Sequence, residues 1–281
     1  SIGEFDRPGY GAWRRRFARG LIIAVAVGFV ALLMVVPLLT VFIEAFGRGI
    51  GVYFDAFRGE DTRAAIRLTL ATAAVVVPLN TLFGVAAAYA IARFQFRGKN
   101  VLTTLIDLPY AISPVISGLT YVMLFGAQGW FGPWLQGRDI SVIFAWPGIL
   151  LATMFVTFPY VARELIPLMQ LLGTEEEEAA ISLGAGGWTT FFRVTLPNIQ
   201  WGVIYGVILC NARAMGVLGA VAVVPGHIRG LTTTMPLHVE ILYNEYNGTA
   251  AFAVASLLSL LAVVTLAVRT AVEGRTAPGG G

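Results

Sequence analysis

The sequence predicts an all-α, polytopic membrane protein with six transmembrane helices. Of its 281 residues, 57% are hydrophobic and 12% are charged, whereas soluble domains carry about 25% charged residues. The mean hydropathy is +0.77. Because the chain lacks the polar residues that would cover so much apolar surface, we exclude a soluble enzyme and a nucleic-acid-binding protein. With one cysteine and two histidines, we expect neither a disulfide nor a metal site.

Six apolar runs are each long enough to cross a bilayer, which takes about 20 residues per helix. In chain order they are residues 21–43, 68–92, 101–125, 140–162, 201–224 and 249–268. Asp107 interrupts the third run and Arg213 the fifth, although a charge at the centre of a span is unfavourable by roughly 2.5–3.5 kcal/mol on insertion scales. An even number of spans places both termini on the same side of the membrane.

The first run follows a cluster of arginines, Arg14, Arg15, Arg16 and Arg19. It is longer than the apolar core of a signal peptide, about 7–15 residues, and no small-residue cleavage site follows it. We therefore expect an uncleaved membrane anchor.

The distribution of positive charge predicts the orientation. With the N-terminus inside, the cytoplasmic segments hold twelve of the nineteen Lys and Arg residues, and the opposite side holds six. Positive residues concentrate on the cytoplasmic side of membrane proteins, so both termini are expected there. We expect residues 1–20 to form a cytoplasmic tail, 21–272 the transmembrane domain, and 273–281 a disordered tail.

Prolines lie inside or near the ends of most apolar runs: Pro37, Pro78, Pro109, Pro114, Pro147 and Pro159. Proline is tolerated in a membrane helix where neighbours satisfy the freed carbonyl groups. The pattern indicates bent helices in a bundle with internal space, as in a transporter; ordinary kinks without a functional role are the alternative.

The segment 165–200 is the long polar loop of the chain. Thr174 precedes four glutamates, and Thr174 with Glu177 matches a capping box at the start of a short helix. Glycines from Gly184 onward end that helix, residues 188–194 follow as a second amphipathic helix, and Leu196-Pro197 ends it. This surface of small and aromatic residues is suited to docking on a soluble partner; the alternative is a solvated acidic linker.

The same loop resembles the EAA loop of binding-protein-dependent ABC importer permeases. Glu178-Ala179-Ala180, then Gly184 and Val194-Thr195-Leu196-Pro197, stand at the spacing of that motif, with Val194 where the family usually has isoleucine. The resemblance implies a type I ABC importer transmembrane domain whose loop couples to an ATPase subunit. The coupling residues it implies are Glu178, Ala179, Ala180, Gly184, Leu196 and Pro197.

Other stretches resemble the W-type permease of sulfate and thiosulfate importers. They are residues 211–216, 219–221, 228–232, 237–246 and 251–256. The resemblance implies a bacterial inner-membrane complex with a second, non-identical permease, two ATPase subunits and a periplasmic sulfate-binding protein. The family commonly has a glutamate where this chain has Val217, which removes one partner that Arg213 could have.

Arg213 and Asp107, each within a span, are the candidates for the substrate path. Intramembrane charges usually face a partner or a water-filled route, and guanidinium geometry suits a tetrahedral oxyanion. A structural ion pair between Arg213 and Asp107 is the alternative reading. His227, Arg229 and His238 are placed on the outer side, where a binding protein would dock.

The chain has no phosphate-binding Gly-Lys-Thr loop and no convergent catalytic set, so we expect no enzyme activity and no cofactor on this chain. ATP and Mg²⁺ would be used by the partner ATPase. Two alternatives stay open: the same kind of permease carrying molybdate or another oxyanion, and an ion-coupled secondary carrier or channel. A membrane enzyme is a third, more remote reading.

Overall fold

The computed structural model describes residues 10–224 and 228–276, with side chains for 17–224, 228–268 and 270. Within these residues every regular element is a helix. The helices are α1 (Tyr10–Phe46), α2 (Ile50–Asp55), α3 (Glu60–Arg93), α4 (Lys99–Ala111), α5 (Pro114–Phe125), α6 (Gly132–Gln136), α7 (Trp146–Leu172), α8 (Glu175–Ser182), α9 (Gly187–Thr190), the π-helical turn η1 (Phe191–Thr195), α10 (Leu196–Met215), α11 (Gly219–Val223), α12 (Met235–Asn244) and α13 (Gly248–Thr276).

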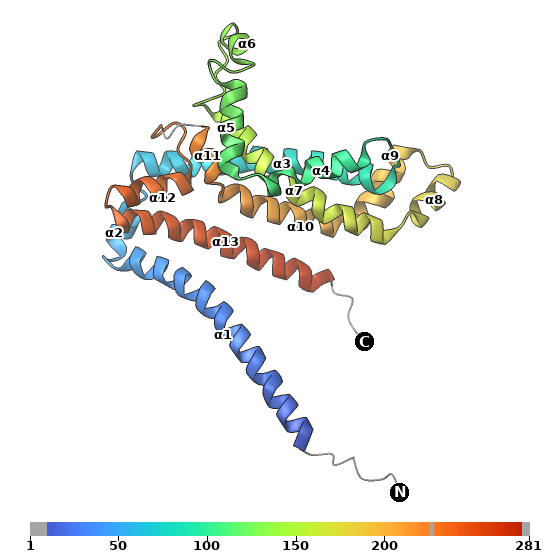
Figure 1. The fold of residues 1–281 in the computed structure, drawn as a ribbon, viewed down its shortest axis with the longest axis horizontal. Coiled ribbons are helices and arrows are strands. Elements are labelled where there is room, and N and C mark those ends of the chain that lie inside the picture. The colour runs from blue at the N-terminus through green and yellow to red at the C-terminus, as the bar shows by residue number, and fades with distance from the viewer. Residues whose placement is uncertain (1–9, 225–227, 277–281) are drawn as a thin grey trace.

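Helices α3, α7 and α10 pack along one another and form the centre of the bundle (Figure 1). A cluster of buried apolar side chains that includes Val77, Leu165 and Ile199 joins all three. A glycine permits the close approach of α3 to α7, since a Cβ added at Gly84 would lie 2.8 Å from Val161. Small residues at such crossings are the usual means of close packing between membrane helices.

The apolar segments occur in the predicted order, and six candidate spans result when the bent α4–α5 pair is counted as one. Several helices extend beyond the apolar runs: α3 begins at Glu60 rather than 68, and α7 continues to Leu172 rather than 162. Hydropathy marks only the length of helix that lies in hydrocarbon, about 20 residues. Backbone hydrogen bonding continues the helix into the polar zone beyond it.

The boundaries of the expected tails also differ. α1 begins at Tyr10, inside the segment 1–20, and α13 continues to Thr276, inside the segment 273–281. Residues 1–9 and 277–281 of the two expected tails lie outside the described residues, as does His227.

The third predicted span, residues 101–125, is not one continuous helix. It consists of α4 and α5, which meet at 110°. Pro114 is the physical reason, because the residue before a proline is disfavoured in the helical conformation. Accordingly, Ser113 has φ −56° and ψ 134° and separates the two helices. Helix α5 leaves the side of the bundle and carries α6 at its far end (Figure 1).

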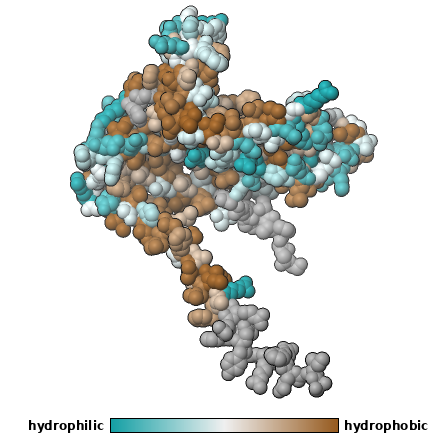
Figure 2. Space-filling model, in the orientation of Figure 1, coloured by the Kyte–Doolittle hydropathy of each residue, from teal (hydrophilic) through white to brown (hydrophobic). Residues whose placement is uncertain are grey.

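Helix α1 packs against α13 and α2 and diverges from the central helices toward its N-terminal end (Figure 1). Its apolar stretch has no buried residues within this chain. Figure 2 shows a largely hydrophobic surface along this projecting helix. So much exposed apolar surface indicates contact with lipid or with another chain.

The bundle has two distinct ends (Figure 1). At one end lie α8 and α9, together with the C-terminal ends of α3 and α7 and the start of α10. Toward the opposite end lie the short helices α2, α11 and α12. We refer to them as the α8 end and the α12 end.

Candidate functional site

The loop predicted at residues 165–200 is shorter than expected and occupies the α8 end. Because α7 continues to Leu172, the polar connection begins at Gly173, and it ends where α10 starts at Leu196. Helix α8 has four glutamates in its first turn. Acidic side chains at this position interact favourably with the positive end of the helix dipole.

The predicted capping box of Thr174 and Glu177 is wrong. The Thr174 hydroxyl donates a 2.6 Å hydrogen bond to the Glu178 carboxylate, and no side chain caps the first turn of α8. Glu177 turns into the bundle, where it is buried and paired with Arg93. A charge-assisted contact is about twice as strong as a neutral one, so the tertiary partner overrides the local pattern.

Gly184 ends α8 in a left-handed conformation with φ +90°. The amide of Gly184 donates to the carbonyl of Ile181 at 2.9 Å, and the amide of Ala185 donates to Ala180 at 3.0 Å. This pair of hydrogen bonds is the Schellman motif, which favours glycine at the left-handed position. Apart from its two chain neighbours, no atom of the described residues lies within 4 Å of a Cβ added at Gly184, so among them the residue is required for its backbone angles and not for space.

The second predicted helix, residues 188–194, is part of a longer helical stretch. α9 passes into η1 and η1 directly into α10. Leu196 and Pro197 therefore begin α10 instead of ending the helix before it. Proline is tolerated in the first turn of a helix. A π-helical turn inside a longer helix is frequently found at functional sites.

Large apolar side chains are exposed at the C-terminal end of α8, in α9 and in η1. Leu183 is 90% exposed and Trp188 79%, and Ile181 and Phe192 are also exposed. The Trp188 and Phe192 rings stack with centroids 6.0 Å apart. Figure 2 shows hydrophobic and hydrophilic residues side by side at this end. We call Ile181, Leu183, Trp188 and Phe192 the docking surface, since exposed apolar patches rimmed by polar groups mark protein contact sites.

A buried polar cluster that the sequence analysis missed lies beneath the docking surface. Arg93, the last residue of α3, pairs with Glu177 at 3.0 Å, and the two side chains are 8% and 11% exposed. Arg93 Nη1 also donates to the carbonyl of Met169 in α7 at 2.7 Å. The Thr195 hydroxyl donates to Glu177 Oε1 at 2.8 Å. We call the side chains of Arg93, Glu177 and Thr195, with the Met169 carbonyl, the clamp.

Arg213 and Asp107 do not form the ion pair that was one reading of the sequence. Asp107 of α4 pairs with Arg163 of α7 at 3.2 Å, and both side chains are about half exposed. Arg213 lies in the last turn of α10, where its side chain is exposed. It has no ion-pair partner among the described side chains.

Val217 lies in an apolar environment between α10 and α11. It is 4% exposed and packs in a cluster with Ile149, Val156 and Val221. The position that the sequence analysis marked as lacking an acidic residue is thus a buried hydrophobic one in this chain. An isolated carboxylate here would lose its hydration, which is strongly unfavourable.

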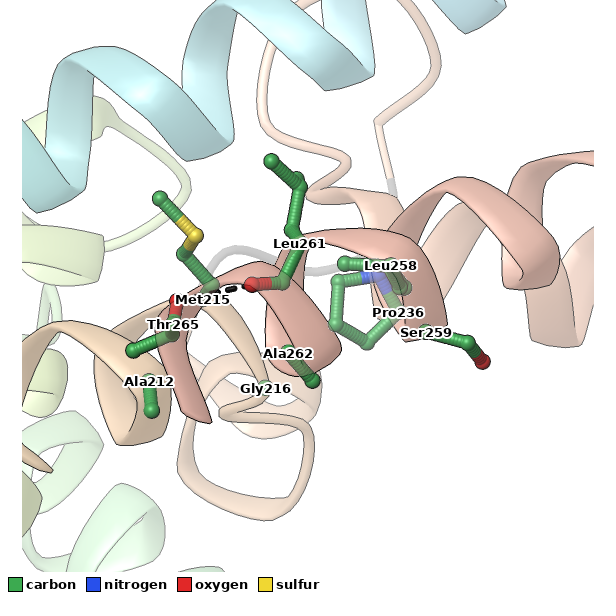
Figure 3. Close-up of a pocket in the computed structure, with 9 residues that line it drawn as sticks. All are labelled: Ala212, Met215, Gly216, Pro236, Leu258, Ser259, Leu261, Ala262 and Thr265. Atoms are coloured by element: carbon green, nitrogen blue, oxygen red, sulfur yellow. Dashed lines mark hydrogen bonds between the residues drawn. The ribbon is translucent and has the colours of Figure 1, made fainter. Parts of the chain in front are cut away.

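Two apolar cavities lie along α13. One, of about 320 Å³, is enclosed by α10, α12 and α13 and includes Met215, Leu261 and Thr265 (Figure 3). The Thr265 hydroxyl donates to the Leu261 carbonyl at 2.7 Å (Figure 3). A neighbouring cavity of about 570 Å³ lies between α3, α10 and α13. Neither is lined by a charged residue, so neither suits a hydrated anion.

The described residues contain no cluster of three metal-ligating side chains.

His238 is buried at the α12 end, although its position in the sequence indicated an outer loop. Its Nε2 atom lies 3.0 Å from the Thr62 hydroxyl of α3, and its side chain belongs to α12. Burial lowers the pKa of His238, while nearby Asp61 raises it and Arg229 lowers it further. The neutral imidazole is therefore the favoured form in the folded protein.

Residues 81–278 match the protein family described as binding-protein-dependent transport system inner membrane component. The chain belongs to this family. The matched region contains the docking surface and the whole clamp. As a member of this family of inner-membrane components the protein is a multi-pass membrane protein, which confirms the fold class and the family predicted from the sequence.

Curated proteins closely similar to this inner membrane component are named for sulfate transport. It is 49% identical over 255 residues to the sulfate transport system permease protein CysW of Synechococcus elongatus, covering 91% of this chain and 89% of that protein. Identity to CysW of Escherichia coli is 43% over 263 residues, covering 94% and 89%. Identity to the E. coli sulfate transport system permease protein CysT is 34%, covering 85% and 86%.

Solved structures of ABC importers share the fold of this inner membrane component. A crystal structure of a bacterial ABC transporter for alginate import superimposes with a TM-score of 0.76, covering 94% of this chain and 98% of that chain at 16% identity. The alginate transporter in complex with an alginate-bound periplasmic protein gives a TM-score of 0.74. At this identity the likeness establishes the transmembrane fold alone.

Proposed function

We propose that this protein is the membrane-spanning subunit of an ATP-driven importer that carries sulfate or thiosulfate across the bacterial inner membrane. The observation that carries the proposal is 43–50% identity, over at least nine-tenths of the chain, to relatives named as sulfate transport system permease proteins. The docking surface supports it, because exposed apolar side chains at a polar end of the bundle suit the binding of a soluble subunit such as an ATPase.

The ATPase subunit binds the docking surface at the α8 end. Glu178 and Ala179 are exposed beside that surface, and Gly184 sets the turn that presents Leu183 to solvent. Ala180 contributes its carbonyl to the same turn. Leu196 and Pro197 start α10 and connect the surface to the membrane helices. ATP and Mg²⁺ are bound by the ATPase subunits, and this chain holds no cofactor.

The working complex contains a second, non-identical permease, two ATPase subunits and a periplasmic sulfate-binding protein. Similarity to both CysW-named and CysT-named proteins supports a pair of related permeases. The apolar stretch of α1 has no buried residues within this chain, which supports contact between α1 and a neighbouring chain. The alginate importer that shares this fold has been solved in complex with a periplasmic protein that carries its substrate, which supports a binding protein as the source of the anion.

The α8 end faces the cytoplasm, and both termini lie on that side. Arg93 ends α3, Lys99 begins α4 and Arg97 lies between them at this end, as the positive-inside rule requires. Helix α13 runs from the α12 end toward the α8 end (Figure 1), which takes the C-terminal segment in the same direction. The α12 end then faces the periplasm.

Arg213 faces the substrate path between the two permeases. It is exposed in this chain and has no ion-pair partner among the described residues, and an arginine in a membrane span usually faces a polar partner or an aqueous route. Its planar guanidinium suits the oxygen atoms of a tetrahedral anion. Asp107, half exposed on α4, lies on the same path and is neutralised by Arg163.

Purification in mild detergent after co-expression with the ATPase subunit tests the docking. Leu183→Glu is the informative variant, because this side chain is 90% exposed and its replacement leaves the fold of this chain intact. Burying a leucine contributes about 1.5–3 kcal/mol, so we expect at least tenfold less retained ATPase for Leu183→Glu and wild-type retention for Leu183→Met. Wild-type protein that retains no ATPase subunit would contradict the docking.

Labelled-anion uptake in a strain that lacks this permease tests the substrate. We expect the wild-type gene to restore uptake of sulfate and of thiosulfate. Restored molybdate uptake without sulfate uptake would replace sulfate by molybdate as the substrate, and uptake driven by an ion gradient without ATP would indicate a secondary carrier.

A further inference from the structure

Helix α8 has one buried side chain, Glu177, which ties it to the rest of the protein. All eight residues of α8 are described, and Glu177 is the one that is buried. Glu175 and Glu178 are exposed, and Glu176 bonds to Asn198 at the surface. No apolar side chain of α8 is buried, so hydrogen bonds hold this helix to the bundle in place of apolar packing.

The clamp ties α8 to three other helices, directly through Arg93 and Thr195 and, through Arg93, to α7. Arg93 ends α3, Met169 lies in the last turns of α7, and Thr195 immediately precedes α10. These are the three helices that form the centre of the bundle. Because the planar guanidinium of Arg93 bonds to α7 and α8 together, it fixes their relative orientation more firmly than a flexible ammonium group would.

The clamp is polar throughout, and each of its two charged side chains makes hydrogen bonds to two partners. The Glu177 Oε1 atom accepts from Arg93 and from Thr195, and Arg93 donates to Glu177 and to Met169. A buried ion pair is tolerated when additional hydrogen bonds complete it, and the loss of one partner leaves an uncompensated charge.

We propose that the clamp transmits the displacement of α8 to α3, α7 and α10, so that Arg93 and Glu177 are positioning residues for the coupling of ATP hydrolysis to transport. This inference rests on the proposed docking of α8 on the ATPase subunit. The docking surface receives the motion, and the clamp passes it to the membrane helices. Loss of the clamp therefore uncouples hydrolysis from transport without detaching the ATPase subunit.

The test uses the complete importer, reconstituted in liposomes with its binding protein, and measures sulfate taken up per ATP hydrolysed. The amount of ATPase retained on the permease is measured in the same preparations. The variants are Glu177→Gln, Arg93→Met, Arg93→Lys and the exchanged pair Arg93→Glu with Glu177→Arg. Glu175→Gln is the matched control, since it removes the same charge from the same helix at an exposed position.

We expect Glu177→Gln and Arg93→Met to retain the ATPase subunits and to lower the uptake per ATP by about tenfold or more, since each leaves a buried charge unpaired. Arg93→Lys and the exchanged pair are expected to recover part of that ratio, and Glu175→Gln to leave it unchanged. An unchanged ratio in Glu177→Gln and Arg93→Met would overturn the clamp while leaving the docking intact. If these two variants lose the assembled complex but keep the wild-type uptake per ATP in the complexes that remain, the clamp serves only the structure of the protein, and the proposal is overturned as well. A wild type that retains no ATPase would overturn the docking itself.

Discussion

Asn80 of α3 donates a 2.7 Å hydrogen bond to the hydroxyl of Thr157 of α7, and both side chains are fully buried. Thr157 in turn donates to the carbonyl of Thr153 at 2.7 Å. The amide of Asn80 also reaches the Met154 carbonyl at 3.2 Å and the Cys210 sulfur of α10 at 3.9 Å. The side-chain amide of Asn80 thus joins the three central helices. The clamp joins the same three helices at a separate place, the α8 end.

Replacement of Asn80 by leucine is expected to lower the free energy of unfolding by about 1 kcal/mol, because hydrogen bonds between membrane helices contribute ~0.6 kcal/mol on average and about 1.7 kcal/mol at most. Unfolding of the purified protein by titration with SDS provides the measurement. Thr157→Val is expected to show a coupling energy of about 0.6 kcal/mol with Asn80→Leu in a double-mutant cycle. Strictly additive effects would show that this hydrogen bond contributes nothing.

Alanine at Gly184 is expected to open the turn after α8. The left-handed conformation is unfavourable by roughly 1–2 kcal/mol for a residue with a Cβ, which corresponds to about 5–30-fold in a local opening equilibrium. Hydrogen exchange of the Ala185 amide is therefore expected to accelerate by that factor, and less in Gly184→Asn. Gly186→Ala is the matched control, because Gly186 has φ −72° and open space around it. Equal acceleration in both alanine variants would contradict the role assigned to the backbone angle.

Acid is expected to destabilise the α12 end through His238. Burial lowers the pKa of His238 in the folded protein, so between pH 7.5 and 5.5 this side chain binds more protons in the unfolded state than in the folded state. The stabilisation from the neutral imidazole is present above the unfolded value of about 6.5. It is lost as the pH falls through the lower folded pKa, at no more than about 1.4 kcal/mol per pH unit.

SDS-induced unfolding at pH 7.5 and 5.5 measures this dependence, and His238→Gln is expected to reduce it. The charged groups that act on His238, Asp61 and Arg229, are unchanged in that variant. If the free energy of unfolding depends on pH identically in the wild type and in His238→Gln, then groups other than His238 cause that dependence.

Charge-poor runs predicted all six spans because lipid imposes an almost uniform composition on whatever crosses it. The same patterns predicted neither the ends nor the bend of these helices. In the sequence, Pro114 indicates where the helix is interrupted. The angle of 110° between α4 and α5 depends on what α5 packs against. Helix ends such as Leu172 depend on backbone hydrogen bonding outside the lipid, on which hydropathy gives no information.

The candidate site was predicted where local chemistry determines it. Gly184 ends α8 as expected, because the left-handed conformation is a property of a single residue. The clamp could not be predicted, since Arg93 and Glu177 lie 84 residues apart. The sequence also gives no reason to choose Glu177 over the three glutamates next to it in the first turn of α8. Glu177 matched a capping box and is instead held by a distant arginine, which shows how tertiary contacts override a local pattern.

The measurement that tests the central claim most directly is sulfate accumulation in liposomes that contain the complete importer, with ATP enclosed on the docking-surface side and binding protein on the other. We expect labelled sulfate to accumulate against its gradient with ATP and not with a non-hydrolysable analogue, and Trp188→Glu to abolish accumulation. Accumulation of sulfate without ATP, or undiminished ATP-driven uptake in Trp188→Glu, would contradict the account.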